Sequence, residues 1–135
     1  MITGSCHCQT VRFEISADIR GFMHCHCHTC RKIHGTVYGS SALVKKAGFT
    51  IVTGEDAITT YESSPGKQRC FCSRCGSHVY AYLEARPETI LLRIGTLDGD
   101  PRVRAQGHIW TSHKALWYDI NDDLPRFDEQ PDRRG

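Results

Sequence analysis

The sequence has no strong excess of charge and no long apolar run. Its 135 residues hold 17 Lys and Arg against 15 Asp and Glu, a formal net charge of +2. This near-balance argues against a nucleic-acid binder that works by bulk charge, and against an acidic disordered tail. No stretch approaches the ~18 apolar residues of a membrane span, and no basic-then-apolar leader opens the sequence. We therefore expect a cytoplasmic location and no membrane partner.

Helical periodicity and apolar content are also modest. Hydrophobic residues make up 39% of the chain and aromatic residues 9%, which is enough for one small core. Cysteine, by contrast, is abundant: there are 8 cysteines, together with 8 histidines. A small core with many cysteines usually depends on disulfides or on bound metal.

The spacing of the cysteines favours metal over disulfides. C-x-C neighbours do not easily pair with each other, because the ring that they would close is strained. C-x-x-C in a tight turn, by contrast, directs two thiolates at one metal ion. The sequence contains three such clusters: Cys6-His7-Cys8, Cys25-His26-Cys27-His28-Thr29-Cys30 and Cys70-Phe71-Cys72-Ser73-Arg74-Cys75-Gly76.

The first and third clusters together predict one closed site. A C-x-x-C turn supplies only half of a tetrahedral zinc site, and Cys6 with Cys8 is the natural pair to complete Cys72 with Cys75. A closed four-thiolate zinc is structural, and it contributes about 10–16 kcal/mol of apparent binding free energy to folding. That range exceeds most values for the net stability of a small domain, about 5–15 kcal/mol.

The middle cluster predicts a second, open site. Cys25, Cys27 and Cys30 lie within six residues and supply three thiolates, and three protein ligands with a vacant position are typical of a catalytic zinc. The alternative is a single four-cysteine site that leaves the other cysteines uncommitted. Cys70 belongs to neither set, and we interpret it as a small buried hydrophobic residue rather than a reactive thiol.

Four histidines surround the middle cluster and leave several roles open. Any one of them could be a fourth ligand, or could be exposed in a loop without a role. Contact with the ligands or the substrate is the better interpretation, because imidazole titrates near physiological pH. They are His24, His26, His28 and His34.

The apolar alternation predicts a mainly β domain with little helix and with metal-binding turns between its strands. We interpret 1–127 as a single domain and 128–135 as a loose tail. Strands are expected over 10–15, 35–44, 49–53, 58–61, 67–71, 78–83 and 89–94, and short helical turns over 29–34 and 111–117. The turn at 63–66 makes 58–61 and 67–71 a hairpin that leads into the third cluster.

The three cysteine motifs in this order resemble those of the glutathione-dependent formaldehyde-activating enzyme family, which also contains centromere protein V. The resemblance extends over about residues 4–127, and the C-terminal part of it rests on His108-Ile109-Trp110, Trp117 and Asp123-Leu124-Pro125. It implies several small coiled antiparallel sheets around zinc. It also implies a structural zinc at Cys6, Cys8, Cys72 and Cys75, and a catalytic zinc at Cys25, Cys27 and Cys30.

The resemblance further implies a carbon–sulfur lyase that condenses glutathione and formaldehyde to S-hydroxymethylglutathione. An open zinc position suits this chemistry, since a coordinated thiol is deprotonated and a metal ion can polarise a carbonyl. Arg31, Lys32 and Arg74 could receive the carboxylates of glutathione, or could be solvated surface charges. The alternative function is a non-catalytic, zinc-stapled binding module. The basic residues are too scattered to favour nucleic acid as its partner.

Overall fold

The computed structural model describes residues 1–131 and divides the chain into two compact units. The first unit consists of Met1–Arg20 and Ala42–Val103. The second consists of Gly21–Ser41 and the chain from Arg104 onward. Each unit contains one of the two predicted sets of metal ligands.

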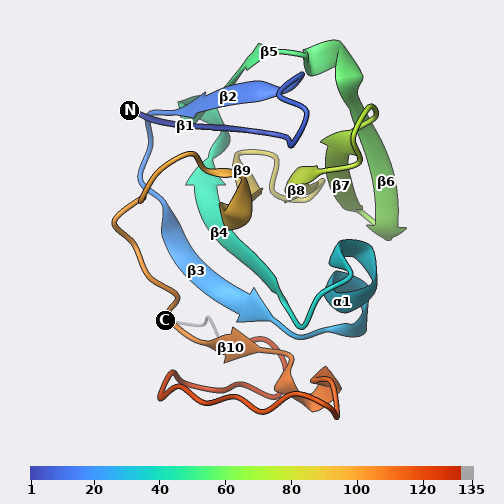
Figure 1. Cartoon of the computed structure of the whole chain (residues 1–135), viewed down its shortest axis with the longest axis vertical. Helices are drawn as coiled ribbons and strands as arrows, with labels where there is room; N and C mark the ends of the chain where they lie inside the picture. Colours follow the sequence, from blue (N-terminus) through green and yellow to red (C-terminus); the bar gives the residue numbers. More distant parts are fainter. Residues whose placement is uncertain (132–135) are drawn as a thin grey trace. The chain divides into compact units, whose positions relative to one another are not determined.

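A three-stranded antiparallel sheet forms one part of the first unit. Its order is β1 (Ile2–Ser5), β2 (Arg12–Ile15) and β5 (Phe49–Thr53) (Figure 1). Val11, Phe13 and Ile15 are buried, as their alternation predicts. Gly4 is opposite Phe13 across the strand pair, and a Cβ on Gly4 would lie 2.3 Å from Cζ of that ring. Close packing of β1 on the core therefore requires glycine at this position.

Longer strands form the rest of the first unit. They run in the order β4 (Gly39–Lys45, of which residues 42–45 belong to this unit), β9 (Thr89–Arg93), β8 (His78–Leu83), β7 (Lys67–Cys72) and β6 (Ile58–Ser64). Strands β6 and β7 form the predicted antiparallel hairpin, which ends at Cys72. Three short 3₁₀ turns connect the strands: η1 (Lys46–Gly48), η2 (Glu55–Ala57) and η3 (Ile94–Thr96).

The second unit is built around one parallel strand pair. Strand β3 (Arg20–Cys25) pairs with β10 (His108–Ile109), so that His24 is opposite His108 and Cys25 is opposite Ile109 (Figure 1). Helix α1 (His28–His34) follows β3, and the turn η4 (Thr111–His113) follows β10. The helix ends at Gly35, whose φ of 57° is the left-handed conformation that glycine adopts without strain.

The mainly β class is confirmed, but the element bounds differ from the prediction in places. Strand β4 begins at Gly39 rather than at Gly35, because Gly35 terminates the helix. The helical segment expected over 111–117 is only the single turn η4, and Lys114 has already left the helical conformation. Strands β1, β3 and β10 were not predicted.

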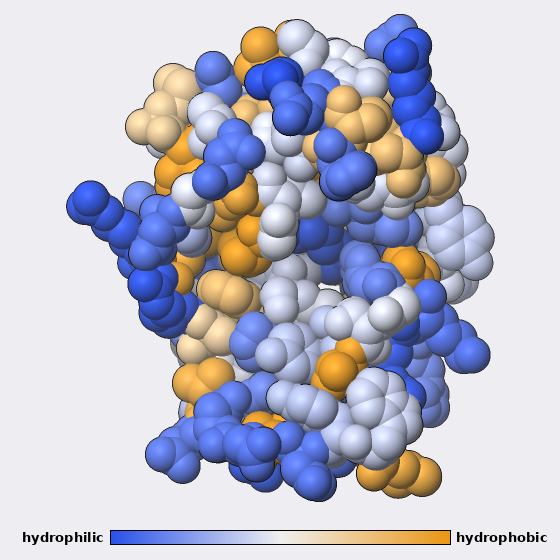
Figure 2. Space-filling view, in the orientation of Figure 1, coloured by the Kyte–Doolittle hydropathy of each residue, from blue (hydrophilic) through white to orange (hydrophobic). Residues whose placement is uncertain are grey.

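On the face drawn in Figure 2, apolar residues are interspersed with hydrophilic ones. Within the described residues, no helix has the length and apolar character needed to cross a membrane. Of the predicted tail 128–135, residues 132–135 lie outside the described residues. In the described part, the carbonyls of Asp128 and Glu129 accept hydrogen bonds from the backbone N–H groups of Ser112 and Trp110.

Candidate metal centres

The first unit brings together the four cysteines of the predicted closed site. The sulfurs of Cys6, Cys8, Cys72 and Cys75 all lie within 4.8 Å of one another, which suits coordination of a single metal ion. Cys6 and Cys72 are buried, whereas Cys8 is exposed. The Sγ atoms of Cys6 and Cys8 are 3.6 Å apart, and those of Cys8 and Cys72 are 3.8 Å apart. The group therefore connects the N-terminal segment to the end of β7.

Two tight turns point these sulfurs inward. In the C-x-x-C turn the N–H of Gly76 donates to the carbonyl of Cys72 at 2.7 Å, and Gly76 has a left-handed φ of 78°. The C-x-C turn is closed by the N–H of Gln9, which donates to the carbonyl of Cys6 at 3.1 Å, with Gln9 also left-handed at φ 64°. The N–H of Val11 donates to Cys6 Sγ at 3.3 Å, which favours the thiolate.

The surroundings of the four thiols differ in their effect on ionisation. Cys75 Sγ lies 3.2 Å from the Ser77 hydroxyl, and this hydrogen bond is the main reason that the pKa of Cys75 falls to about 5. Burial raises the pKa of Cys6 to about 11. Cys75 is therefore ionised near neutral pH, whereas Cys6 resists ionisation. The group of four sulfurs then carries a partial negative charge, which a metal cation would neutralise.

Two hydroxyls beside this group were not identified from the sequence. Thr10 Oγ1 lies 3.2 Å from Cys8 Sγ and lowers the pKa of that thiol, as Ser77 does for Cys75. Each hydroxyl follows its cysteine by two positions, so this spacing is the signal that could have indicated them. Hydrogen bonds of this kind orient metal ligands and adjust their basicity.

The second unit brings together Cys25, Cys27 and Cys30. Their sulfurs also lie within 4.8 Å of one another. Cys25 ends β3, and Cys27 caps helix α1, where its Sγ accepts a hydrogen bond from the N–H of Cys30 at 3.3 Å. The other two thiols raise the pKa of Cys25 strongly, and burial adds to the shift. Three thiolates cannot coexist at this separation without a cation, so the donor set fits a metal ion.

A buried series of hydrogen bonds begins at His26, which lies between Cys25 and Cys27 in the sequence, and continues through His108 to Asp122. His26 Nε2 lies 2.8 Å from His108 Nδ1, and His108 Nε2 lies 2.9 Å from Asp122 Oδ2. Both rings are fully buried. The hydrogen bond to His108 holds the pKa of Asp122 below its usual value, so the carboxylate is ionised and can only accept. The ionised carboxylate thus assigns a hydrogen to Nε2 of His108, and with a neutral His108 ring Nδ1 accepts the hydrogen of His26 Nε2.

This assignment leaves Nδ1 of His26 as a buried acceptor that has no hydrogen-bond partner among the described residues. Burial, reinforced by the neighbouring His108, lowers the pKa of His26 to about 4, so the ring is neutral near pH 7. The tyrosines Tyr38 and Tyr118 flank the same ring, with centroids 5.0 and 6.4 Å away. His26 therefore acts as a rigid neutral link between Cys25 and Cys27.

The histidines near the middle cluster and Cys70 lie outside both cysteine groups. Both metal-binding groups found among the described residues consist of cysteines alone, so none of the four histidines joins them. His24 Nδ1 lies 2.8 Å from the Ser40 hydroxyl, and the exposed His28 stacks on His113 with ring centroids 4.2 Å apart. Cys70 is buried in β7, where burial raises its pKa, and it also belongs to neither group.

The arrangement defines a mainly β protein with two cysteine clusters, one with four thiols and one with three, each able to hold a metal ion. The family described as glutathione-dependent formaldehyde-activating enzyme matches residues 1–113. The chain belongs to this family.

Similar proteins agree with this assignment. A Halomonas elongata protein, provisionally named a glutathione-dependent formaldehyde-activating enzyme, is 32% identical over 128 residues, which cover 89% of this chain and 81% of that protein. An Emericella nidulans protein with the same provisional name is 25% identical over 81 residues, 58% of this chain and 41% of its own length. A Rhodobacter sphaeroides crystal structure has the same fold, with a TM-score of 0.59, 24% identity, and coverage of 73% of this chain and 89% of that one.

Proposed function

We propose that this chain is a zinc-dependent carbon–sulfur lyase that condenses glutathione with formaldehyde to S-hydroxymethylglutathione. The three-thiol group Cys25, Cys27 and Cys30 carries the proposal, because three protein ligands leave a coordination position for a substrate. The family name supports the substrates. A reducing compartment such as the cytoplasm suits eight free cysteines, all of which lie in the described residues.

The reaction forms one carbon–sulfur bond and cleaves none in the carbon skeleton. The glutathione sulfur adds to the carbonyl carbon of formaldehyde, and the thiol proton ends on the new hydroxyl. A bound zinc would supply a site where a thiol ionises at neutral pH. Two hydrogen bonds of the chain itself hold the three sulfurs together. The N–H of Cys30 donates to Cys27 Sγ, and the hydrogen bond with His108 fixes His26 between Cys25 and Cys27.

We assign the four-thiol group, Cys6, Cys8, Cys72 and Cys75, to a structural zinc. Four protein ligands complete a tetrahedron and leave no position for a substrate. The division of roles can be tested by metal content and unfolding of Cys27→Ser and Cys72→Ser, with Cys70→Ala as a control that removes a thiol outside both groups. We expect two zinc ions per wild-type chain, one in a folded Cys27→Ser protein, and a loss of folded structure in Cys72→Ser. Unfolding of both variants would contradict the division of roles.

The activity is tested by exchange NMR between formaldehyde hydrate and its glutathione adduct. Wild type and Cys70→Ala should accelerate the exchange, and Cys27→Ser should not. An absence of acceleration by a two-zinc protein, even at enzyme concentrations comparable to those of the substrates, would refute the formaldehyde reaction. That result would favour the second candidate, a non-catalytic zinc-stapled binding module.

A further inference from the structure

The C-terminal segment, residues 104–131, fixes the strand end of the three-thiol group. The backbone N–H of His26 donates to the carbonyl of Ile109 at 3.0 Å. Its side chain begins the hydrogen bonds that run through His108 to Asp122, at 2.8 and 2.9 Å. His26 lies between the first two cysteines of the group, so residues from the other end of the sequence hold both its main chain and its side chain.

The backbone on either side of His26 explains why this anchor acts on the thiols. Cys25 ends strand β3, and Cys27 has the extended dihedral angles φ −61° and ψ 153°. Successive side chains of an extended chain point to opposite sides, so the two cysteines face one way and His26 faces the other. Their burial agrees, because His26 is fully buried whereas both cysteines are half-buried. A displacement of the His26 ring would therefore move two of the three sulfurs.

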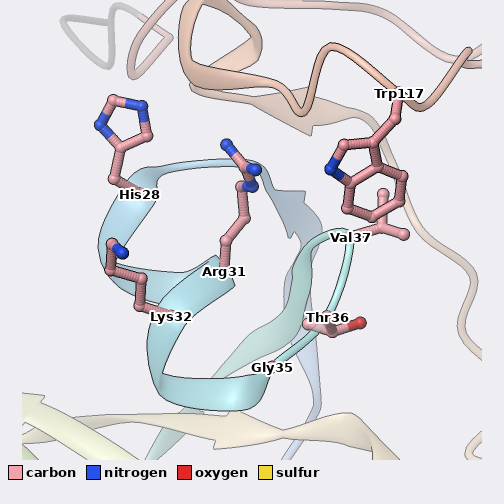
Figure 3. A pocket seen from close by; sticks show the side chains of 7 residues that line it. All are labelled: His28, Arg31, Lys32, Gly35, Thr36, Val37 and Trp117. Carbon is pink, nitrogen blue, oxygen red and sulfur yellow. The ribbon is translucent and has the colours of Figure 1, made fainter.

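Arg31 connects the helix end of the group to the same C-terminal segment. It directly follows Cys30 in helix α1, and its Nη1 donates to the backbone carbonyl of His113 at 2.9 Å. Figure 3 shows this side chain rising from α1 toward the segment that carries Trp117. A helix of 7 residues has little stability of its own and depends on such tertiary contacts. The C-terminal segment thus contacts the three-thiol group at both of its ends.

The buried polar series at His26 is more than core packing requires. Apolar side chains of similar volume would fill this space without the cost of removing polar atoms from water. The series also leaves Nδ1 of His26 buried without a hydrogen-bond partner among the described residues, which is a further cost. Directional hydrogen bonds add one fixed orientation of the ring, and bonds of this kind behind metal ligands orient those ligands.

We propose that Asp122 and His108, acting through His26, and Arg31 are positioning residues for a metal ion at the three-thiol group. They hold the two ends of the group so that its sulfurs lie close enough together to bind one ion. That a metal ion occupies this group rests on the proposed function, whereas the hydrogen bonds do not. The family match ends at residue 113, so it assigns no role to Asp122.

Zinc affinity can be measured at each cysteine group separately, by alkylation and mass spectrometry in graded concentrations of a chelator. Thiols that hold zinc are protected from iodoacetamide, so peptides 25–30 and 72–75 report the two groups independently. We expect Asp122→Ala and Arg31→Gln to lower the chelator midpoint of the three-thiol group roughly 10-fold, the lower end of the range for residues behind metal ligands. The midpoint of the four-thiol group should not change.

Neighbouring residues supply matched controls. Asp123→Ala and Lys32→Gln remove the same charges from exposed positions one residue away, and both midpoints should stay at the wild-type value. Leu92→Ala opens a cavity in the core of the first unit and leaves the positioning residues intact, so it should not shift the three-thiol midpoint selectively. His108→Gln retains one acceptor and one donor, and its midpoint should lie closer to wild type than that of His108→Ala.

Cadmium-113 NMR supplies a readout that a general loss of stability would not move. In protein loaded with two cadmium ions, the resonance that is absent from Cys27→Ser belongs to the three-thiol group. Asp122→Asn keeps an acceptor oxygen but loses the charge, and we expect this resonance alone to shift or broaden. If Arg31→Gln or His108→Ala does not fold, the two Asp122 variants decide the question.

Several results would overturn the proposal. An unchanged three-thiol midpoint in Asp122→Ala or in Arg31→Gln would remove the positioning role of that residue. Equal shifts of both midpoints, matched by Leu92→Ala, would reduce the hydrogen bonds to general stabilisation. An unchanged cadmium resonance in Asp122→Asn, together with unchanged midpoints in Asp122→Ala, would exclude any effect of the C-terminal segment through His26.

The exchange assay separates this proposal from the function on which it partly rests. If wild type binds two zinc ions without accelerating exchange, and Asp122→Ala selectively weakens the three-thiol group, the lyase function fails and the positioning role stands. If wild type accelerates exchange and the midpoints of the Asp122 and Arg31 variants equal that of wild type, the positioning role fails and the lyase function stands. A wild-type chain without metal at the three-thiol group would overturn both.

Discussion

The histidine chain makes a quantitative prediction that a double-mutant cycle can test. His26→Ala and His108→Ala each remove the 2.8 Å hydrogen bond between two fully buried rings. Each single variant also leaves the other ring with an unsatisfied buried nitrogen, which costs about 1–3 kcal/mol beyond the bond itself. His108→Ala additionally removes the bond to Asp122 and leaves a cavity.

The cost of each substitution follows from these losses. We expect His108→Ala to lower the free energy of unfolding by about 3–5 kcal/mol, a large part of the ~5–15 kcal/mol typical of a small domain. His26→Ala should cost less, because His108 keeps its bond to Asp122. In the double variant neither ring remains to be left unsatisfied. Because both penalties are absent from it, the double variant should be less destabilised than the sum of the two single variants by about 2–6 kcal/mol.

Urea unfolding followed by circular dichroism, at one fixed free zinc concentration, measures all four proteins. Coincident transitions by fluorescence are needed to justify a two-state treatment. Additivity of the two substitutions within ~0.5 kcal/mol would mean that the rings are not coupled and would refute the hydrogen-bonded chain. A metal content that is unchanged in His108→Ala would show in addition that the destabilisation is not an indirect effect of metal loss.

Three further predictions concern single side chains. Asp122→Asn should lower stability near pH 7, and because the folded pKa of Asp122 is depressed, the difference from wild type should disappear as pH falls through that pKa in pH-dependent unfolding. Ser77→Ala should raise the pKa of Cys75 above about 5 and weaken zinc binding in the first unit about 10- to 100-fold in chelator competition; unchanged affinity would contradict the role of the hydroxyl. Gly4→Ala should destabilise by about 1–3 kcal/mol in a thermal melt, since its Cβ would meet the Phe13 ring at 2.3 Å, and a wild-type melting temperature would contradict this packing.

The sequence was most informative where a structure depends on neighbouring residues. The strand over 49–53 and the hairpin that ends at Cys72 follow from local alternation and a turn signal, and both are present. The three-thiol group and each half of the four-thiol group follow from local spacing in the same way, whereas the joining of the two halves follows from the need of a tetrahedral site for four ligands. Strand β3 was not predicted because buried and exposed residues do not alternate along it. Its partner β10 also lies more than 80 residues away in the sequence, so no local turn signal indicates the pairing.

The histidine chain shows why the rest of the site could not be predicted. His26 and His108 are 82 positions apart, and Asp122 follows 14 positions later, so no local pattern relates the three residues. The helical segment predicted over 111–117 failed for a local reason, because Trp110 is left-handed and Lys114 is already extended, which limits the segment to one turn. Leu116 and Trp117, which would be core residues of a longer helix, are instead exposed.

The discontinuous second unit has a consequence for the order of events during synthesis. The first unit has all of its four metal ligands once Cys75 has emerged from the ribosome, long before synthesis reaches position 131. Cys25, Cys27 and Cys30 emerge earlier still, but His108 follows His26 by 82 positions, and Asp122, which binds His108, follows 14 positions after that. The three-thiol group thus lacks this support until both side chains have been made, and a nascent chain stalled near residue 100 would contain all four cysteines of the four-thiol group together with three unsupported thiols.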